Sequence, residues 1–206
     1  MPSLDEKILR VYVAGISDAD ISDPLVPPER EREVRAVRSQ SLMREKYLAW
    51  KLLERAVKET FNMDISDACI TKQESGMWTS PYFYFSLSHS RDALAVAVSA
   101  HPVGVDIERI VQPRSSAFVD RVLSDSERAR YDSLPGKEQA LYLTECWTRK
   151  ESDFKRRGLT AFVPKNYAPD QREVLTRSFE IRTETYVLSV VSKIAECAEL
   201  IEEIIL

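Results

Sequence analysis

The stretch HPVGVDIERI, residues 101–110, alternates apolar and polar side chains as a β-strand does. Val105 and Ile107 would point to one face of this strand, and Asp106 and Glu108 would share the other. Two interpretations of the paired carboxylates are open. On an edge strand with one wet face they would simply be solvated. In a buried strand their mutual repulsion would call for a divalent cation, and oxygen ligands favour Mg²⁺.

Two more strands are expected just before this stretch. The run ALAVAVSA, residues 93–100, is apolar on both faces, which is typical of a central strand. It follows YFYFSLSHS, residues 82–90, after a tight turn at Arg91 and Asp92. A central strand next to residues 101–110 favours burial of the two carboxylates, and therefore favours the cation over the solvated face.

The rest of the chain switches between helical and strand-like periodicity. The long helix near the end of the chain should stop at a glycine, which is a common helix terminator. The expected elements are a strand at 7–15, helical periodicity over 29–61 with a break near 39–41, a capping box of Ser124 and Glu127, a helix over 137–157 ending near Gly158, and strand-like runs at 178–183 and 185–193.

The chain contains one internal echo. Residues 85–99 and 179–192 are both hairpin-like, with an apolar second arm, and each segment follows a long helix. This repetition predicts an α+β fold made of two similar halves, residues 1–110 and 111–206, joined near residues 109–115. We expect the active-site cleft to lie between the two halves.

A second charged group lies in CWTRKESDFKRRG, residues 146–158. Lys150 and Glu151 fall on the apolar stripe of the expected helix, and Lys155 follows Glu151 by four positions. Such spacing is commonly a solvent-exposed Glu–Lys pair. The alternative is a charged patch inside a cleft, with Glu151 as a third carboxylate ligand and the two lysines facing anionic groups.

Two further groups could contact an anion. His89 lies between two serines in SLSHS, residues 86–90, where a histidine is commonly structural, although the hydroxyls could also hold a phosphate. The first helical region is rich in basic residues, Arg44 among them, and one or two of these could reach a phosphate. Together with the acidic residues they indicate a phosphorylated substrate neutralised by a cation. The lack of a Gly-rich loop argues against P-loop and Rossmann chemistry.

Composition excludes several other classes. The chain has 206 residues and a net charge of −4, so its charge gives no support to a nucleic-acid partner. No apolar run reaches the roughly 18 to 20 residues that span a bilayer, and the first residues do not resemble a signal peptide. Cys69, Cys146 and Cys197 lack metal-ligand spacing and are expected to be buried or half-buried in a reducing cytosol. Two histidines argue against a zinc site.

Three motifs occur in a characteristic order: SLSHS (86–90), GVDIE (104–108), and WTRKES followed by Lys155 (147–155). Together they resemble the 4′-phosphopantetheinyl transferases of the larger, two-lobed, surfactin-synthetase-activating type, over essentially the whole chain. The resemblance implies two pseudo-twofold-related α+β halves and holo-[acyl-carrier-protein] synthase activity. It also implies Mg²⁺ as cofactor, coenzyme A as substrate, an apo acyl or peptidyl carrier protein as partner, and a cytoplasmic monomer.

The resemblance also implies roles for the acidic residues and for one lysine. Asp106, Glu108 and Glu151 would bind Mg²⁺ on the pyrophosphate of coenzyme A. Glu151 would be the base that deprotonates the carrier serine, which would then attack the β-phosphate. Lys155 would stabilise or protonate the leaving 3′,5′-ADP.

Four further residues would contact coenzyme A. Ser88 and His89 would meet the adenosine 3′-phosphate region, Lys150 would lie near the phosphates, and Arg44 would bind from the first helical region. The carrier would dock on a basic cluster at the end of the long helix. This basic cluster is defined as Arg149, Lys150, Lys155, Arg156 and Arg157.

The sequence departs from the family pattern in several places, and the stretch after Lys155, RRGLTAFVPKN, has fewer glycines than is common. The lysine of a Gly-Lys-Pro element that often precedes the SHS motif is absent, and Asp153 stands where an apolar or neutral residue is usual. Two alternatives therefore stay open. One is a degenerate module that binds coenzyme A or a carrier without transfer, and the other is a different Mg²⁺-dependent phosphoryl or pyrophosphate-cleaving enzyme.

Overall fold

The computed structural model describes residues 5–16, 20–110, 112 and 115–204. The strands are β1 Leu9–Gly15, β2 Thr71–Lys72, β3 Trp78–Thr79, β4 Tyr84–Ser90, β5 Ala93–Ser99, β6 Gly104–Arg109, β7 Val174–Ile181, β8 Glu184–Val191 and β9 Glu199–Ile204. The helices are α1 Pro28–Arg35, α2 Gln40–Phe61, α3 Ser116–Val122, α4 Asp125–Asp132 and α5 Gly136–Arg157, with short 3-10 turns at Ile65–Ala68, Pro164–Asn166, Gln171–Glu173 and Ala195–Cys197.

The first large sheet has the strand order β4-β5-β1-β9. β5 pairs antiparallel with both β4 and β1, and every residue of β5 is buried, which confirms the expected central strand. Helix α2 packs against this sheet and contributes Tyr47, Trp50 and Leu53 to its core. The apolar residues of α2 recur at three- and four-residue steps, so one face of the helix is buried against the strands.

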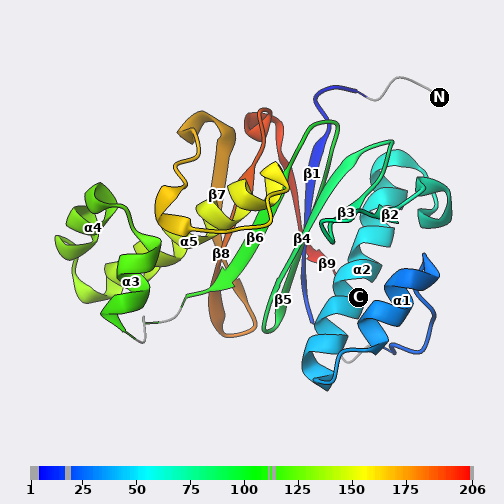
Figure 1. Cartoon of the computed structure of the whole chain (residues 1–206), viewed down its shortest axis with the longest axis horizontal. Coiled ribbons are helices and arrows are strands. Elements are labelled where there is room, and N and C mark those ends of the chain that lie inside the picture. The colour runs from blue at the N-terminus through cyan, green and yellow to red at the C-terminus, as the bar shows by residue number, and fades with distance from the viewer. Residues whose placement is uncertain (1–4, 17–19, 111, 113–114, 205–206) are drawn as a thin grey trace.

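The second sheet has the order β6-β8-β7, with both pairs antiparallel. Helix α5 packs against β6 and β8, just as α2 packs against the first sheet. Figure 1 shows the two sheets in the middle of the molecule, with α1 and α2 at one end, α3 and α4 at the other, and α5 running across the second sheet. The mixture of sheets and helices confirms the predicted α+β class.

β6 is an edge strand of its sheet, yet it is not solvent-exposed. Val105 and Ile107 belong to the apolar core, and Asp106 is also buried. The edge of β6 that is free of β8 meets the side chains of β4, so the two sheets come together along these two strands. β6 therefore combines features of both interpretations. It lies at the edge of its sheet, as a solvated strand would, but it is buried, as a cation site would be.

Local sequence signals place the helix ends. Residues 36–39 separate α1 from α2, and Ser39 caps α2 by accepting a hydrogen bond from the Leu42 N–H, close to the expected break. The capping box of Ser124 and Glu127 starts α4 as predicted. Helix α5 ends at Gly158, whose φ of +61° is the left-handed conformation that favours glycine.

The division into residues 1–110 and 111–206 stays a prediction, and parts of its junction, residues 111, 113 and 114, lie outside the described residues. Two strands cross that division. β6 pairs with β8 of the second sheet, whereas β9 runs parallel to β1 of the first sheet. Each half, if the division holds, contributes one strand to the sheet of the other.

The expectation for the cysteines is wrong at one position. Cys146 is buried and Cys197 is half-buried, but Cys69 is exposed, and all three are free thiols. Cys69 ends the 3-10 turn Ile65–Ala68 with a φ of +49°, and its side chain is exposed although its chain neighbours Ala68 and Ile70 are buried. Among the described helices, none combines the length and the apolar character that a membrane crossing requires.

Gly104 permits the close approach of α5 to β6. A Cβ at Gly104 would lie 1.8 Å from the Ser152 carbonyl oxygen, a backbone atom that cannot rotate away. We expect Gly104→Ala to lower the free energy of unfolding by about 3 kcal/mol, because overpacking forces the helix off the sheet. Urea denaturation measures this change.

The matched control is Gly136→Ala, at the first position of α5. A Cβ there would meet nothing within 4 Å. This substitution should raise the free energy of unfolding by roughly 0.5 kcal/mol, because alanine restricts the unfolded chain. Equal stabilities of Gly104→Ala and the wild-type protein would contradict the packing described for β6 and α5.

Candidate active site

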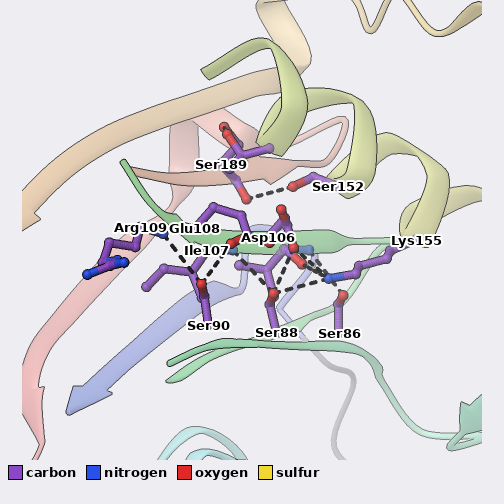
Figure 2. A network of polar contacts seen from close by, with 12 residues as sticks. Ser86, Ser88, Ser90, Asp106, Ile107, Glu108, Arg109, Ser152, Lys155 and Ser189 are labelled. Atoms are coloured by element: carbon purple, nitrogen blue, oxygen red, sulfur yellow. Dashed lines mark hydrogen bonds and ion pairs between the residues drawn. The ribbon is translucent and has the colours of Figure 1, made fainter. Parts of the chain in front are cut away.

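Asp106 lies at the centre of a polar network between β4, β6 and α5 (Figure 2). Its side chain is buried, and its Oδ1 accepts hydrogen bonds from Ser88 Oγ at 2.7 Å and from Lys155 Nζ at 2.8 Å. Its other oxygen, Oδ2, is buried without a hydrogen-bond partner among the described residues. Burying a carboxylate oxygen without a hydrogen-bond donor costs free energy. The unused lone pairs of such an oxygen are suited to a cation.

Glu108 follows two positions later on the same face of β6, as the sequence predicted. Ser90 Oγ donates a hydrogen bond to Glu108 Oε2 at 2.7 Å. Burial and the repulsion of Asp106 raise the pKa of Glu108 to about 7, although the Ser90 hydrogen bond opposes the rise. A cation between the two side chains would favour the ionised form of this carboxyl group.

Glu151 approaches the same region from α5. It is half-buried, and burial raises its pKa above the ordinary value while Lys155 opposes the rise and Asp106 adds to it. The three predicted carboxylates thus influence one another electrostatically. Within the part of the chain that the structure describes, however, no three acidic, histidine or cysteine side chains are close enough together to hold a metal ion.

The residues present fit a divalent cation in part. Asp106 and Glu108 share one strand face, one of them offers a partnerless buried oxygen, and their repulsion is the kind that a cation relieves. Glu151 is not brought into one ligand group with them. The ammonium group of Lys155 instead supplies the positive charge beside Asp106.

Lys155 connects α5 to both strands. Its Nζ donates to Asp106 Oδ1, to Ser88 Oγ at 3.2 Å and to the carbonyl oxygen of Val105 at 3.2 Å. Three acceptors match the three protons of an ammonium group, so the side chain is held in one position. A cavity of about 320 Å³ opens beside it, lined in part by Met77, Ser86 and Phe154.

Ser88 and His89 point to different partners, although the resemblance placed both at the adenosine 3′-phosphate. The Ser88 hydroxyl is buried against Asp106. His89 Nδ1 lies 3.0 Å from Glu45 Oε2 of α2, and burial lowers the pKa of His89 while Glu45 opposes the change. Alternation along β4 explains the separation. Arg44 is half-buried on α2, directly before Glu45.

Lys150 lies apart from the carboxylates of β6. Its side chain is almost fully buried, and its Nζ donates to the Val122 carbonyl at 2.8 Å and to Glu127 Oε2 at 2.6 Å. Burial alone would raise the pKa of Glu127, but the hydrogen bonds from Lys150 and Ser124 outweigh it and hold that pKa below the ordinary value. The structure thus pairs Lys150 with α3 and α4, and its place near the phosphates stays a prediction.

The basic cluster is charge-paired throughout. The unexpected Asp153 is fully buried and pairs with both Arg156 and Arg157, and Arg156 also contacts Glu173. The remaining pairs are Arg149 with Glu145, Lys150 with Glu127 and Lys155 with Asp106. These acidic partners reduce the positive charge that the sequence alone suggested for a carrier-docking surface.

Two serines of β4 that were not predicted as site residues support β6 and its carboxylates. Ser90 binds Glu108, and Ser86 binds the backbone of β6 through the Val105 N–H. The signal was the spacing of SLSHS, because serines at every second position share one face of a strand. That pattern was interpreted as a phosphate contact rather than as a connection to the next sheet.

The raised pKa of Glu108 predicts a pH dependence of stability. Between its ordinary pKa of 4.5 and the folded value of about 7, the unfolded chain loses this proton while the folded protein keeps it. The free energy of unfolding should therefore fall as the pH rises through this window in the absence of divalent cations. Urea denaturation from pH 5 to pH 8 measures the trend.

Glu108→Gln should remove that part of the pH dependence and make the protein more stable than the wild type at pH 8. Glu196→Gln, which changes an exposed carboxylate, serves as the control and should leave the slope unchanged. A wild-type slope retained by Glu108→Gln would assign the effect to another group.

Comparisons with known proteins identify relatives of this chain. Residues 102–190 match the model of the 4′-phosphopantetheinyl transferase superfamily. The 4′-phosphopantetheinyl transferase psf-1 of Bacillus pumilus is 40% identical over 78 residues, which is 38% of this chain and 33% of the relative. The 4′-phosphopantetheinyl transferase Sfp of Bacillus subtilis is 26% identical over 142 residues, 68% of this chain and 63% of the relative.

A third relative is the 4′-phosphopantetheinyl transferase AcpT of Salmonella typhimurium, 31% identical over 113 residues, 50% of this chain and 58% of the relative. The matches thus span from a third to just under two thirds of these curated relatives. The residues matched by the family model include Asp106, Glu108, Glu151 and Lys155. Residues 102–190 of this chain are therefore similar to the 4′-phosphopantetheinyl transferase superfamily, the family that the motifs predicted.

Proposed function

We propose that this protein transfers the 4′-phosphopantetheine arm of coenzyme A to a serine of an apo acyl or peptidyl carrier protein and releases 3′,5′-ADP. The observation that carries the proposal is the contact between Lys155 of α5 and Asp106 of β6, at 2.8 Å. It joins two of the three motifs of the family resemblance at one point. The names of the relatives support the same reaction.

Asp106 and Glu108 would hold the Mg²⁺ ion, with Glu151 as the third acidic residue of the site. When bound, the ion would neutralise the pyrophosphate of coenzyme A. The partnerless Oδ2 of Asp106 and the raised pKa of Glu108 support this assignment. Ligand binding would have to draw Glu151 closer, because the three side chains do not yet form one ligand group.

Glu151 would act as the general base. Burial raises the pKa of Glu151 above its ordinary value, which makes its carboxylate a stronger base toward the carrier serine. The serine oxygen then bonds to the β-phosphorus, the bond from that phosphorus to the bridging oxygen breaks, and 3′,5′-ADP leaves. Lys155 would stabilise the charge on the leaving phosphate or protonate it, since its ammonium group already lies beside Asp106.

His89 and Arg44 would bind the adenosine 3′-phosphate from the side of α2, where the Glu45 contact holds His89. Ser88 and Lys150, which the resemblance also gave to coenzyme A, are each committed to buried protein contacts. We assign Ser88 to the support of Asp106 and Lys150 to the anchoring of α4 on α5.

We also propose a cytoplasmic monomer of two α+β halves with the cleft between them. The three free cysteines are consistent with a reducing compartment. In such a division the β6 and β9 strands would be exchanged between the halves, as the sheet pairing indicates.

The test is mass spectrometry of apo acyl and peptidyl carrier proteins incubated with this protein, coenzyme A and Mg²⁺. We expect a carrier to gain the mass of phosphopantetheine, and chelation of Mg²⁺ should stop the reaction. Hydrolysed coenzyme A with unmodified carriers would instead indicate a pyrophosphate-cleaving enzyme. Binding of coenzyme A without either product would indicate a module that has lost catalysis.

The controls for this assay are Asp106→Asn and Glu151→Gln. Both keep the size of the side chain and remove one of several clustered negative charges, so the fold should persist. Each should lower the rate of transfer by at least about 100-fold. Wild-type rates at ordinary Mg²⁺ concentrations would refute the assignment of the site.

The two lysines of the motif should behave differently. Lys155→Met should lower the kcat of the folded protein by about 100- to 1,000-fold, because it removes a donor at the site of charge development, and it should also lower the free energy of unfolding, because Asp106 and the Val105 carbonyl lose a donor. Lys150→Met should mainly lower the free energy of unfolding, by roughly 2 to 3 kcal/mol, because Glu127 and the Val122 carbonyl lose a buried donor. Urea denaturation and single-turnover assays on the folded protein separate the two effects.

The reverse pattern would restore the role that the resemblance gave to Lys150. A Lys150→Met protein of wild-type stability that transfers at a strongly reduced rate would indicate a direct phosphate contact. The same substitution type at both positions makes the comparison direct, since each replaces an ammonium group by an apolar chain of similar length.

A further inference from the structure

Three serines of β4 take the place of a neighbouring strand for β6. Serines at alternate positions share one face of β4, and each hydroxyl accepts a hydrogen bond from an outward-pointing N–H of β6 (Figure 2). We call these contacts the serine ladder. They are Val105 N–H to Ser86 Oγ at 3.1 Å, Ile107 N–H to Ser88 Oγ at 3.2 Å, and Arg109 N–H to Ser90 Oγ at 3.4 Å.

The constant offset of the ladder means that β4 and β6 run in the same direction without forming a common sheet. Buried backbone N–H groups require acceptors, and an unpaired strand edge otherwise exposes them. Here side-chain hydroxyls meet the requirement. The ladder therefore fixes the strand that carries Asp106 and Glu108 against the first sheet.

Two rungs of the ladder make a second bond. A hydroxyl has one proton to donate as well as lone pairs that accept. Ser88 donates its proton to Asp106, and Ser90 donates its proton to Glu108, both at 2.7 Å. Each serine thus holds the carboxylate of one β6 residue and the N–H of the next, which fixes that side chain relative to its own backbone.

The first rung lacks this second bond for a simple reason. The residue that precedes Val105 is Gly104, which has no side chain to receive a proton. Ser86 therefore makes the same backbone contact as Ser90 but holds no carboxylate. The chain thereby contains its own matched control for the effect of the hydroxyl on the carboxylate.

We propose that Ser90 is a positioning residue, whose hydroxyl holds Glu108 in the orientation that binds the divalent cation. The inference rests on the proposed cation site at Asp106 and Glu108. A glutamate has three side-chain torsions to fix, so a carboxylate left without its donor is distributed over several rotamers. Residues that orient metal ligands in this way typically contribute about 10- to 100-fold to metal affinity.

The experiment compares Ser90→Ala with Ser86→Ala in the full-length protein. Calorimetric titration with Mg²⁺ at saturating coenzyme A, corrected for Mg²⁺ binding to free coenzyme A, measures the affinity without any catalysis. Ser90→Ala should raise the Kd for Mg²⁺ by about 10- to 100-fold. Ser86→Ala should leave it within about twofold of the wild-type value, because this serine contacts only the backbone of β6.

Two more measurements separate positioning from a purely structural effect. Both alanine variants lose one backbone contact, and Ser90→Ala also loses the bond to Glu108, so urea denaturation should give a slightly larger loss in the free energy of unfolding for Ser90→Ala. The Mg²⁺ concentration for half-maximal transfer should rise only in Ser90→Ala, with kcat at saturating Mg²⁺ close to the wild-type value. Ser90→Thr keeps a hydroxyl at this half-buried position and should restore the wild-type affinity.

The proposal is overturned if Ser90→Ala binds Mg²⁺ as tightly as the wild type. It is likewise overturned if Ser86→Ala weakens Mg²⁺ binding as much as Ser90→Ala does. It is also overturned if the wild-type protein with coenzyme A binds no Mg²⁺. A wild-type protein that binds Mg²⁺ more tightly than Ser90→Ala, yet modifies no carrier, would support the role of Ser90 and refute the proposed transfer. The failure of one proposal is therefore distinct from the failure of the other.

Discussion

The attachment of β6 to elements other than its own sheet is the constraint on which the candidate site depends. β8 satisfies one edge of this strand, and the serine hydroxyls of β4 satisfy the N–H groups of the other edge. Helix α5 covers the strand so closely that position 104 accepts only glycine without a shift of the backbone. Because three elements hold β6, its two carboxylates are kept in an environment shielded from water. A carboxylate by itself would be less stable there than in water.

The electrostatics of the site follow from that burial. Two acidic side chains on one strand face, a third approaching from α5 and one lysine in contact give a group of charges that does not balance. The imbalance is expressed as the raised pKa of Glu108 and of Glu151, and as the partnerless oxygen of Asp106. A site with such an excess of negative charge favours the binding of a cation or a proton. This is the physical basis of the proposed cation site and of the proposed general base.

Helix α5 carries one lysine that makes a structural contact and one that lies at the candidate site. Lys150 and Lys155 are five positions apart, which corresponds to well over one turn and leaves them on different sides of the helix. One side meets α3 and α4, where Lys150 closes a buried contact with Glu127, and the other side meets β6, where Lys155 contacts Asp106. Their spacing in the motif therefore reflects two requirements, the assembly of the helical layer and the charge at the site.

The elements and the chemistry of their residues were predictable without the structure, because they depend on local periodicity and on side-chain type. The strand pair over residues 82–100, the capping box at Ser124, the end of α5 at Gly158 and the shared face of Asp106 and Glu108 were all predictable in this way. Only the tertiary structure decided which side chains meet. That Lys150 turns to Glu127, that Ser88 faces Asp106, and that Glu151 stays outside a common ligand group are consequences of how β4 and α5 pack on β6, which no local pattern encodes.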